Sequence, residues 1–225
     1  MFGKIAGRYD LLNHLLSANR DRAWRRRAAA MLPDERGAKV LDLCGGTGDL
    51  TLEILRQDRA GFVVCCDFAR PMLARAGRKF DRGGVAGRTS LVEADALRLP
   101  FPDGSFDAVT VAFGVRNLSD LGAGLAEMLR VLVPGGTLVV LEFSTPDGPV
   151  LSRLYRLYLD RLLPRLGDTV SRESGPYGYL ARTIASFPDG PALAGRIRDA
   201  GFAACEWFPL TGGIVAVHRA RSAAR

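Results

Sequence analysis

Apolar runs alternate with amphipathic stretches along most of this chain, and the alternation predicts its secondary structure. The apolar runs are short and nearly uninterrupted, which is typical of parallel strands buried on both faces. We expect strands at 39–43, 62–67, 90–93, 106–113 and 137–143, a tight turn at 134–136, and helices at 49–56, 71–80 and 121–132. Strands and helices at this spacing form right-handed βαβ units, so the pattern predicts a doubly wound, mostly parallel sheet.

Three segments lie outside this alternation. Residues 1–32 are predicted to form an N-terminal helical cover. The tail holds two apolar runs, 203–209 and 213–219, joined by a glycine-rich turn that predicts an antiparallel hairpin. Before this hairpin, 146–190 is an amphipathic helical insert that packs on the core, forms a lid, or faces a membrane. No linker divides the chain, so 1–225 is predicted to be a single domain.

The junction between the first predicted strand and its helix carries the most information. Gly45, Gly46 and Gly48 form a turn at which a ligand approaches the backbone and meets the free N–H groups of the helix. Two details separate this turn from the dinucleotide fingerprint G-x-G-x-x-G. Asp42 lies inside the strand, and Thr51 stands where the third glycine would be.

A carboxylate beside this turn repels a pyrophosphate and attracts an ammonium group. The pattern therefore favours a zwitterion joined to a nucleoside, S-adenosylmethionine, over NAD. We expect Asp42 to attract the methionine ammonium directly or through water. The hydroxyl of Thr51 and the free N–H groups of the first helical turn would hold the methionine carboxylate.

Acidic residues also follow the next two strands. Asp67 ends the strand 62–67, where a carboxylate suits two ribose hydroxyls. After the third strand, Asp95 is expected to accept from the adenine amino group, and the N–H of Ala96 to donate to the ring. Ligands of open parallel sheets bind beyond the carboxyl ends of the strands, where these residues fall. With the hairpin tail, they predict a class I S-adenosylmethionine-dependent methyltransferase fold.

Composition narrows the remaining classes of protein. The net charge is +7, carried by 28 arginines and three lysines, and Arg25-Arg26-Arg27 is the densest cluster. No base-reading motif accompanies this charge, so no nucleic-acid partner is expected. The four cysteines lack CxxC spacing, which indicates reduced buried thiols and no metal. Neither a membrane-spanning run nor a signal peptide is visible, so the prediction is a cytoplasmic protein.

Motifs at both ends and in the middle of the chain point to a family. They are Phe2-x-x-Ile5-Ala6-x-x-Tyr9-Asp10-x-x-Asn13-x-x-x-Ser17 with Trp24-Arg25, then Gly114-Val115-Arg116-Asn117, and finally Leu210-Thr211-Gly212-Gly213-Ile214-Val215-Ala216. These motifs resemble the ubiquinone/menaquinone biosynthesis C-methyltransferase family. The resemblance covers nearly the whole chain, and the last two motifs are specific to that family.

The resemblance implies methylation of a ring carbon of a polyprenylated quinol by S-adenosylmethionine, without a metal. Demethylmenaquinol is the expected substrate, and the benzoquinol intermediate of ubiquinone biosynthesis is the alternative. A nucleic-acid or other small-molecule methyltransferase is a more remote alternative. The cofactor contacts that carry over are Thr51, Asp67, Asp95 and Ala96.

A quinol ring carbon becomes nucleophilic when an adjacent hydroxyl loses its proton, and it must lie in line with the methyl group. The strand 106–113 ends beside the methyl group in this fold, so Arg116 and Asn117 are the predicted catalytic residues. Arg116 would stabilise the developing phenolate or polarise a water that takes its proton, and Asn117 would orient the quinol oxygen. Tyr9 and Asn13 are expected to cover the ring.

The prenyl tail implied by the resemblance would keep the substrate in a membrane. We therefore expect transient peripheral association with the inner face of the membrane, through the basic segment 151–165 and the arginines around Arg25. The oligomeric state stays open, with a homodimer among the alternatives.

Overall fold

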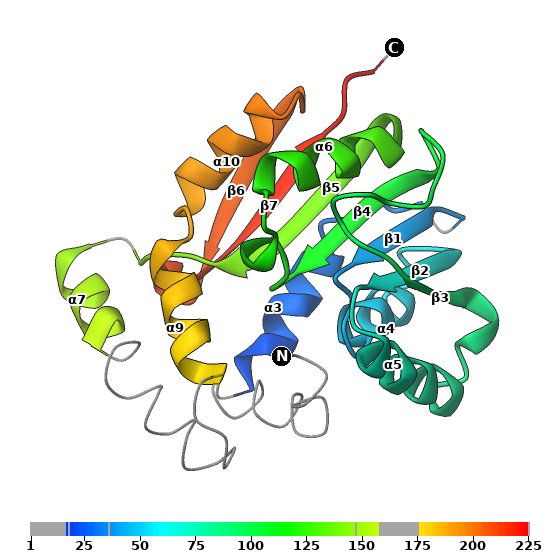
Figure 1. Ribbon diagram of the computed structural model, residues 1–225, viewed down its shortest axis with the longest axis horizontal. Coiled ribbons are helices and arrows are strands. Elements are labelled where there is room, and N and C mark those ends of the chain that lie inside the picture. The colour runs from blue at the N-terminus through cyan, green and yellow to red at the C-terminus, as the bar shows by residue number, and fades with distance from the viewer. Residues whose placement is uncertain (1–16, 18, 36, 147, 158–175, 225) are drawn as a thin grey trace.

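A computed structural model describes residues 17, 19–35, 37–146, 148–157 and 176–224, which build a seven-stranded sheet of order β3-β2-β1-β4-β5-β7-β6 (Figure 1). The strands are β1 (Lys39–Leu43), β2 (Phe62–Asp67), β3 (Thr89–Glu93), β4 (Phe106–Ala112), β5 (Leu132–Phe143), β6 (Ala204–Leu210) and β7 (Val215–Arg221). β1 to β5 pair in parallel, whereas β7 is antiparallel to both β5 and β6. The predicted parallel sheet with an antiparallel C-terminal hairpin is confirmed.

Helices cover both faces of this sheet, because successive residues of a buried strand point to opposite sides. The helices are α3 (Arg20–Ala29), α4 (Asp49–Arg56), α5 (Arg70–Arg82), α6 (Leu121–Val131), α7 (Pro149–Leu157), α9 (Pro176–Ser186) and α10 (Gly190–Asp199), with short 3-10 turns η1 (Ala86–Arg88), η2 (Val115–Asn117) and η4 (Thr211–Gly213). Leu41 and Leu43 of β1 face the layer of α6 and α10, and Val40 faces the layer of α3 and α4.

Two elements differ from the sequence prediction. β5 begins at Leu132, so the predicted tight turn at 134–136 lies inside the strand. The strand absorbs these residues through a shift in its register with β4, between the partners of Phe106 and Ala108. The helix α10 was not predicted, although Asp189 caps it by accepting from the N–H of Ala192 and a proline stands in its first turn.

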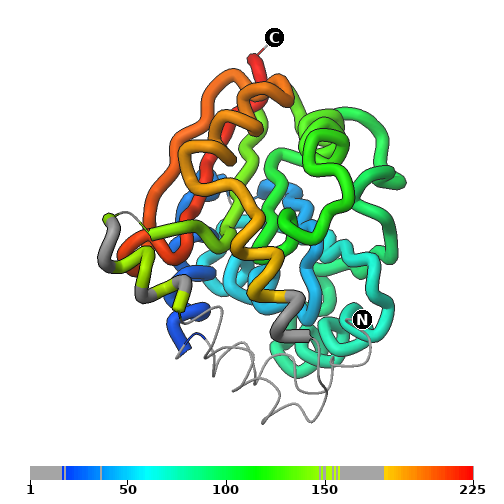
Figure 2. Tube along the Cα trace, turned by 60° about the vertical axis from the view of Figure 1, so that its left-hand side comes forward, coloured from blue at the N-terminus to red at the C-terminus, as the bar shows by residue number. Residues whose placement is uncertain are grey.

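The N-terminal helix α3 packs beside the C-terminal hairpin, as Figures 1 and 2 show. Its Trp24 is buried and donates a hydrogen bond of 2.8 Å from Nε1 to Oγ1 of Thr211, in the turn between β6 and β7. α3 falls within the predicted cover, and α7 and α9 fall within the predicted insert. Within the described part of the chain, every helix is too short or too polar to cross a bilayer.

Candidate active site

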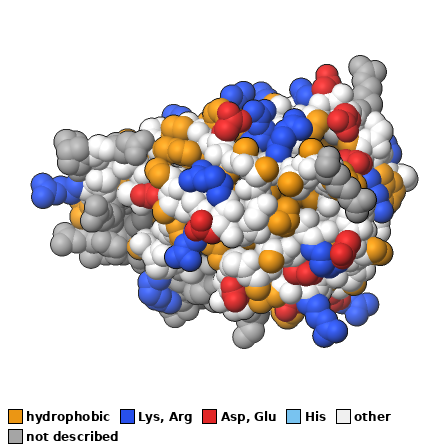
Figure 3. Space-filling view, turned by 90° about the horizontal axis from the view of Figure 1, so that it is seen from above, with side chains coloured by type: hydrophobic (Ala, Val, Ile, Leu, Met, Phe, Trp, Pro, Cys, Tyr) orange, Lys and Arg blue, Asp and Glu red, His pale blue; other side chains and the backbone are white. Residues whose placement is uncertain are grey.

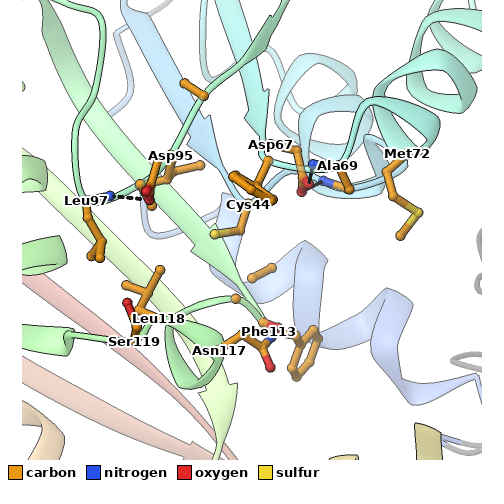
Figure 4. Close-up of a pocket in the computed structure, with 17 residues that line it drawn as sticks. Cys44, Asp67, Ala69, Met72, Asp95, Leu97, Phe113, Asn117, Leu118 and Ser119 are labelled. Carbon is orange, nitrogen blue, oxygen red and sulfur yellow. Dashed lines mark hydrogen bonds between the residues drawn. The ribbon is translucent and has the colours of Figure 1, made fainter. Parts of the chain in front are cut away.

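A cavity of about 330 Å³ opens beyond the carboxyl ends of β1, β2, β3 and β4 (Figure 4). Its lining comes from the turn after β1, the start of α5, the loop after β3 and the turn after β4. The lining residues are Leu43, Cys44, Gly46, Asp67, Phe68, Ala69, Met72, Ala94, Asp95, Ala96, Leu97, Ala112, Phe113, Gly114, Asn117, Leu118 and Ser119. This is the edge of an open parallel sheet at which ligands bind.

The turn after β1, the start of α5 and the loop after β3 form the first half of this cavity, and Asp67 lines it. Its Oδ2 accepts from the N–H of Gly46 at 2.8 Å, and its Oδ1 accepts from the N–H of Ala69 at 2.8 Å. Burial raises the pKa of Asp67, although these two N–H groups oppose the rise. Each oxygen keeps acceptor capacity towards the cavity, since a carboxylate offers about four lone-pair sites. The carboxylate can therefore accept from two neighbouring hydroxyl groups.

Asp95 and Ala96 line the same half of the cavity, as the sequence predicted. Oδ1 of Asp95 accepts from the N–H of Leu97 at 2.9 Å, which holds the carboxylate at the start of the loop after β3. Phe68 lies next to Asp67 and has 77% of its surface exposed. An exposed aromatic beside two fixed carboxylates suits a flat heterocycle with polar edges.

Asp42 and Thr51 are buried beneath the glycine turn and do not line the cavity. Oγ1 of Thr51 donates to Oδ2 of Asp42 at 2.6 Å, and Oγ1 of Thr110 donates to Oδ1 at 3.0 Å. The expected contacts of Asp42 and Thr51 with a ligand, for Asp42 directly or through water, stay predictions. Both side chains bond each other, because β1 turns Asp42 towards the layer of α3 and α4.

The glycines of the turn also divide their roles. Gly46 lines the cavity in a left-handed conformation with φ +56°, and a Cβ there would lie 3.9 Å from Cε of Met72, on the surface that a ligand would use. Gly45 is absent from the lining, and its Cβ would lie only 2.5 Å from Sγ of Cys65. Gly45 is thus required for packing against β2, and Gly46 provides the close backbone approach.

The turn after β4 forms the second half of the cavity. Phe113, Gly114 and Asn117 line it, and the side chain of Arg116 does not. Phe113 has φ +59°, a strained conformation for an aromatic residue. Its carbonyl accepts from Nη1 of Arg116 at 2.7 Å, which holds this conformation.

Arg116 forms a buried ion pair behind that turn. Its side chain is 6% exposed, and Nη1 donates to Oε1 of Glu142 at 2.6 Å. Burial raises the pKa of Glu142, and the guanidinium of Arg116 opposes the rise. The guanidinium also lies 5.2 Å from the ring centroid of Phe143. The structure thus places Asn117 at the cavity and Arg116 behind it, and the catalytic roles of both residues stay predictions.

The predicted ring-covering residues Tyr9 and Asn13 lie outside the described residues. Sequence reasoning missed Phe68, Met72 and Phe113 as lining residues. Of these, Phe68 could have been found, because it is an aromatic residue directly after Asp67 at the end of a predicted strand. Over the described residues, no group of three or more His, Cys, Asp or Glu is arranged to hold a metal ion. The donor set suits a nucleoside, with one carboxylate for a diol, one for a base and a backbone cradle between them.

Asp42→Asn is expected to remove a pH dependence of stability. Burial raises the pKa of Asp42 from 3.8 to about 6, so the folded protein binds this proton more tightly than the unfolded chain does. The stability that the group contributes is therefore present at low pH and is lost as the pH rises through about 6. One pKa unit corresponds to about 1.4 kcal/mol, so the loss is about 3 kcal/mol.

Denaturant unfolding of the wild type, Asp42→Asn and the exposed control Asp81→Asn on α5 measures this effect. The free energy of unfolding of Asp42→Asn should gain on the wild type between about pH 4 and about pH 7.5. Asp81→Asn should follow the wild type. A constant difference between Asp42→Asn and the wild type over this range would contradict the prediction.

Arg116→Met is expected to lower the free energy of unfolding by about 3–5 kcal/mol, because it leaves the carboxylate of Glu142 buried without its partner. The double variant Arg116→Met/Glu142→Gln removes the buried charge as well and should recover most of this loss, which chemical denaturation measures. Turnover of the folded double variant then reports on Arg116 itself. We expect this turnover to stay measurable. Abolished turnover in a double variant that folds and still binds its ligand in the cavity would mean that Arg116 takes part in the chemical step.

Comparison with known proteins identifies the family of this chain. The ubiE/COQ5 methyltransferase family matches residues 1–222. A demethylmenaquinone methyltransferase of Thermus thermophilus is 48% identical over 218 residues, which are 97% of this chain and 98% of that protein. A ubiquinone/menaquinone biosynthesis C-methyltransferase of Cronobacter sakazakii is 43% identical over 220 residues, which are 97% of this chain and 88% of that protein.

Solved structures agree on the fold. A SAM-dependent methyltransferase of Thermotoga maritima, 18% identical, aligns with a TM-score of 0.69 over 98% of this chain and 97% of its own. A SAM-dependent methyltransferase of Aquifex aeolicus, 17% identical, aligns with a TM-score of 0.65 over 88% of each chain. The seven-stranded sheet is therefore that of the class I methyltransferases, and with the family matched from residue 1 to residue 222 the chain belongs to the ubiE/COQ5 methyltransferase family.

Proposed function

We propose that this protein transfers a methyl group from S-adenosylmethionine to a ring carbon of demethylmenaquinol. The observation that carries the proposal is the 48% identity, over 97% of the chain, to a protein named demethylmenaquinone methyltransferase. A Mycobacterium protein of the same name is also 48% identical, over 220 residues. The cavity supports the proposal because it combines a nucleoside-type half with a second half that opens at the end of β4.

The first half of the cavity fits the proposed methyl donor. Asp67 would accept from both ribose hydroxyls, while Asp95 and the N–H of Ala96 would bind the edge of the adenine. The left-handed turn at Gly46 gives the backbone its close approach to the amino-acid part. When bound, S-adenosylmethionine supplies an electrophilic methyl group. Asp42 and Thr51 act indirectly in this proposal, by supporting the turn from beneath.

The second half fits the ring of the acceptor. Phe113 and Leu118 give it apolar walls, and Asn117 gives it an amide. We infer that Asn117 orients a quinol oxygen, and that Arg116 positions Asn117 and Phe113 through the turn. This arrangement would hold the ring carbon in line with the methyl group, which is the main requirement of such a transfer.

The benzoquinol of ubiquinone biosynthesis is the second candidate acceptor. Relatives at 43% identity carry a name that covers both pathways, so the benzoquinol stays in the proposal as the alternative. A nucleic-acid substrate has less support. Basic and acidic side chains are interspersed on the face shown in Figure 3, and that face offers no continuous basic groove.

An assay with labelled S-adenosylmethionine tests the proposal. The purified protein is incubated with demethylmenaquinol and, separately, with the benzoquinol, and the products are identified by mass. We expect methylation of the naphthoquinol at the higher kcat/KM. Calorimetry with S-adenosylmethionine and NAD is the binding control. Transfer to neither quinol, or binding of NAD without binding of S-adenosylmethionine, would overturn the proposal.

We further propose that the protein associates transiently with a membrane surface, where a polyprenylated substrate resides. In Figure 1, α7 and α3 both lie below the sheet, near the end where β4 and β5 finish, with α9 between them. α7 exposes Leu151 and Leu157, and α3 exposes Arg22 and Arg26. Exposed leucines and arginines together suit an interface with anionic lipid.

Co-sedimentation with anionic vesicles measures this association. Leu157→Ser removes an apolar side chain that is 50% exposed on α7, and Leu91→Ser removes one that is 40% exposed on β3. We expect weaker sedimentation for Leu157→Ser alone, and a decrease for both proteins at high salt. Equal sedimentation of the two variants would exclude α7 from the contact.

A further inference from the structure

Lys79 of α5 bonds both sides of the glycine turn from behind. Its Nζ donates to Oγ1 of Thr47 at 2.9 Å and to Oδ1 of Asp49 at 2.6 Å. These two residues flank Gly48, which has a left-handed conformation with φ +81° and precedes α4. One ammonium group therefore bridges the last residue before the bend and the first residue of α4.

Phe80, the residue of α5 after Lys79, packs directly against the same turn at Gly48. A Cβ at Gly48 would lie 2.5 Å from Cε1 of Phe80 and 3.1 Å from Cβ of Ala76. Phe80 is itself fully buried between α5 and β2. The backbone at Gly48 is thus pressed against a rigid aromatic ring while Lys79 bonds the residues on either side.

The other end of the turn is tied to the start of the same helix. Asp67 bonds the N–H of Gly46 and the N–H of Ala69, and Met72 of α5 lines the cavity. Lys79 lies about two turns further along α5 than Met72, at 3.6 residues per turn, and contributes nothing to the cavity lining. α5 thereby connects the cavity surface with a support behind the turn.

The position of Lys79 is not explained by stability alone. A cation near the first turn of a helix opposes the helix dipole, and Lys79 lies at the first turn of α4. The Lys79–Asp49 pair is partly exposed, at 26% and 24% of the two side chains, so water screens it and its net contribution to stability is small. This chain has 28 arginines and three lysines, and the other cations of α5 are Arg70, Arg75, Arg78 and Arg82. A compact ammonium suits a site between a hydroxyl and a carboxylate better than a planar guanidinium does.

We propose that Lys79 is a positioning residue that holds the glycine turn in the conformation that receives the methyl donor. It would set the affinity for S-adenosylmethionine without touching it, and the identity of that ligand rests on the proposed function. We call the two hydrogen bonds of Lys79 to Thr47 and Asp49 the clamp. Without the clamp the turn samples other conformations, and binding must then order it at a cost in affinity. The acceptor half of the cavity, which the turn after β4 forms, should be unaffected.

Lys79→Met tests the clamp, with Arg82→Met as the matched control, because Arg82 is an exposed cation on the same helix. We expect Lys79→Met to weaken S-adenosylmethionine binding by about tenfold in calorimetry, in line with the loss of one charge-assisted hydrogen bond. The KM for S-adenosylmethionine should rise by a similar factor, while kcat and the KM for the quinol stay within about twofold. Arg82→Met should match the wild type in all of these.

A double-mutant cycle assigns the effect to the pair. Asp49→Asn removes the other end of the 2.6 Å bond, so the double variant Lys79→Met/Asp49→Asn should bind no more weakly than Lys79→Met alone. Fully additive losses would mean that the two residues act separately and would overturn the clamp. A lowered melting temperature with a parallel rise in both KM values would overturn it as well, because that result indicates a general loss of structure.

Hydrogen exchange of the free protein gives a readout that needs no ligand. The backbone amides from Gly45 to Leu50 should exchange faster in Lys79→Met than in the wild type and Arg82→Met, with unchanged exchange in β4 and β5. Unchanged exchange at the turn would overturn the clamp. If the wild type binds no S-adenosylmethionine, the proposed function fails, and the exchange comparison still decides whether Lys79 holds the turn.

Discussion

The carboxylate of Asp67 connects the two segments on which the first half of the cavity depends. One oxygen bonds the N–H of Gly46 and the other bonds the N–H of Ala69, so the turn after β1 and the start of α5 are joined at the end of β2. The turn needs this support because Cys44 and Gly46 both have positive φ, and Cys44 is not a glycine. The same carboxylate lines the cavity, so one side chain both holds the two segments together and offers hydrogen-bond acceptors to a ligand.

A second group of contacts joins segments that lie far apart in the sequence. Trp24 of α3 bonds Thr211 in the turn before β7, and its ring centroid lies 6.1 Å from that of Phe113. Phe113 in turn packs on Phe143, with ring centroids 4.8 Å apart. The N-terminal helix, the turn after β4 and the C-terminal hairpin therefore meet at one aromatic cluster beside the cavity. Residues far apart in the sequence are thus brought together by packing around the side chains of Trp24, Phe113 and Phe143.

The sequence predicted the bounds of β1, α4 and β2 correctly, because buried parallel strands bounded by turn residues leave a clear pattern. It also placed Asp67 and Asp95 at the cavity, since acids that follow parallel strands share one edge of the sheet. The orientation of Asp42 was available from alternation, as it points to the same side as Val40 and away from Leu41. The burial of Arg116 was not available, because its partner Glu142 is 26 residues away and meets it only through the β4–β5 register.

The two halves of the cavity are coupled where their turns touch. A Cβ at Gly114 would lie 2.4 Å from Cβ of Cys44, so the backbone of the turn after β4 lies directly against the side chain of Cys44 in the turn after β1. Cys44 and Phe113 are also both held at positive φ, the one at the end of β1 and the other at the end of β4. The start of the turn after β1, at Cys44, therefore cannot shift without the turn after β4, since each is strained and packed against its neighbour. Lys79 bonds Thr47 and Asp49 at the far end of the first turn, so its support acts on the segment around Gly48 and leaves this contact, and with it the second half of the cavity, in place.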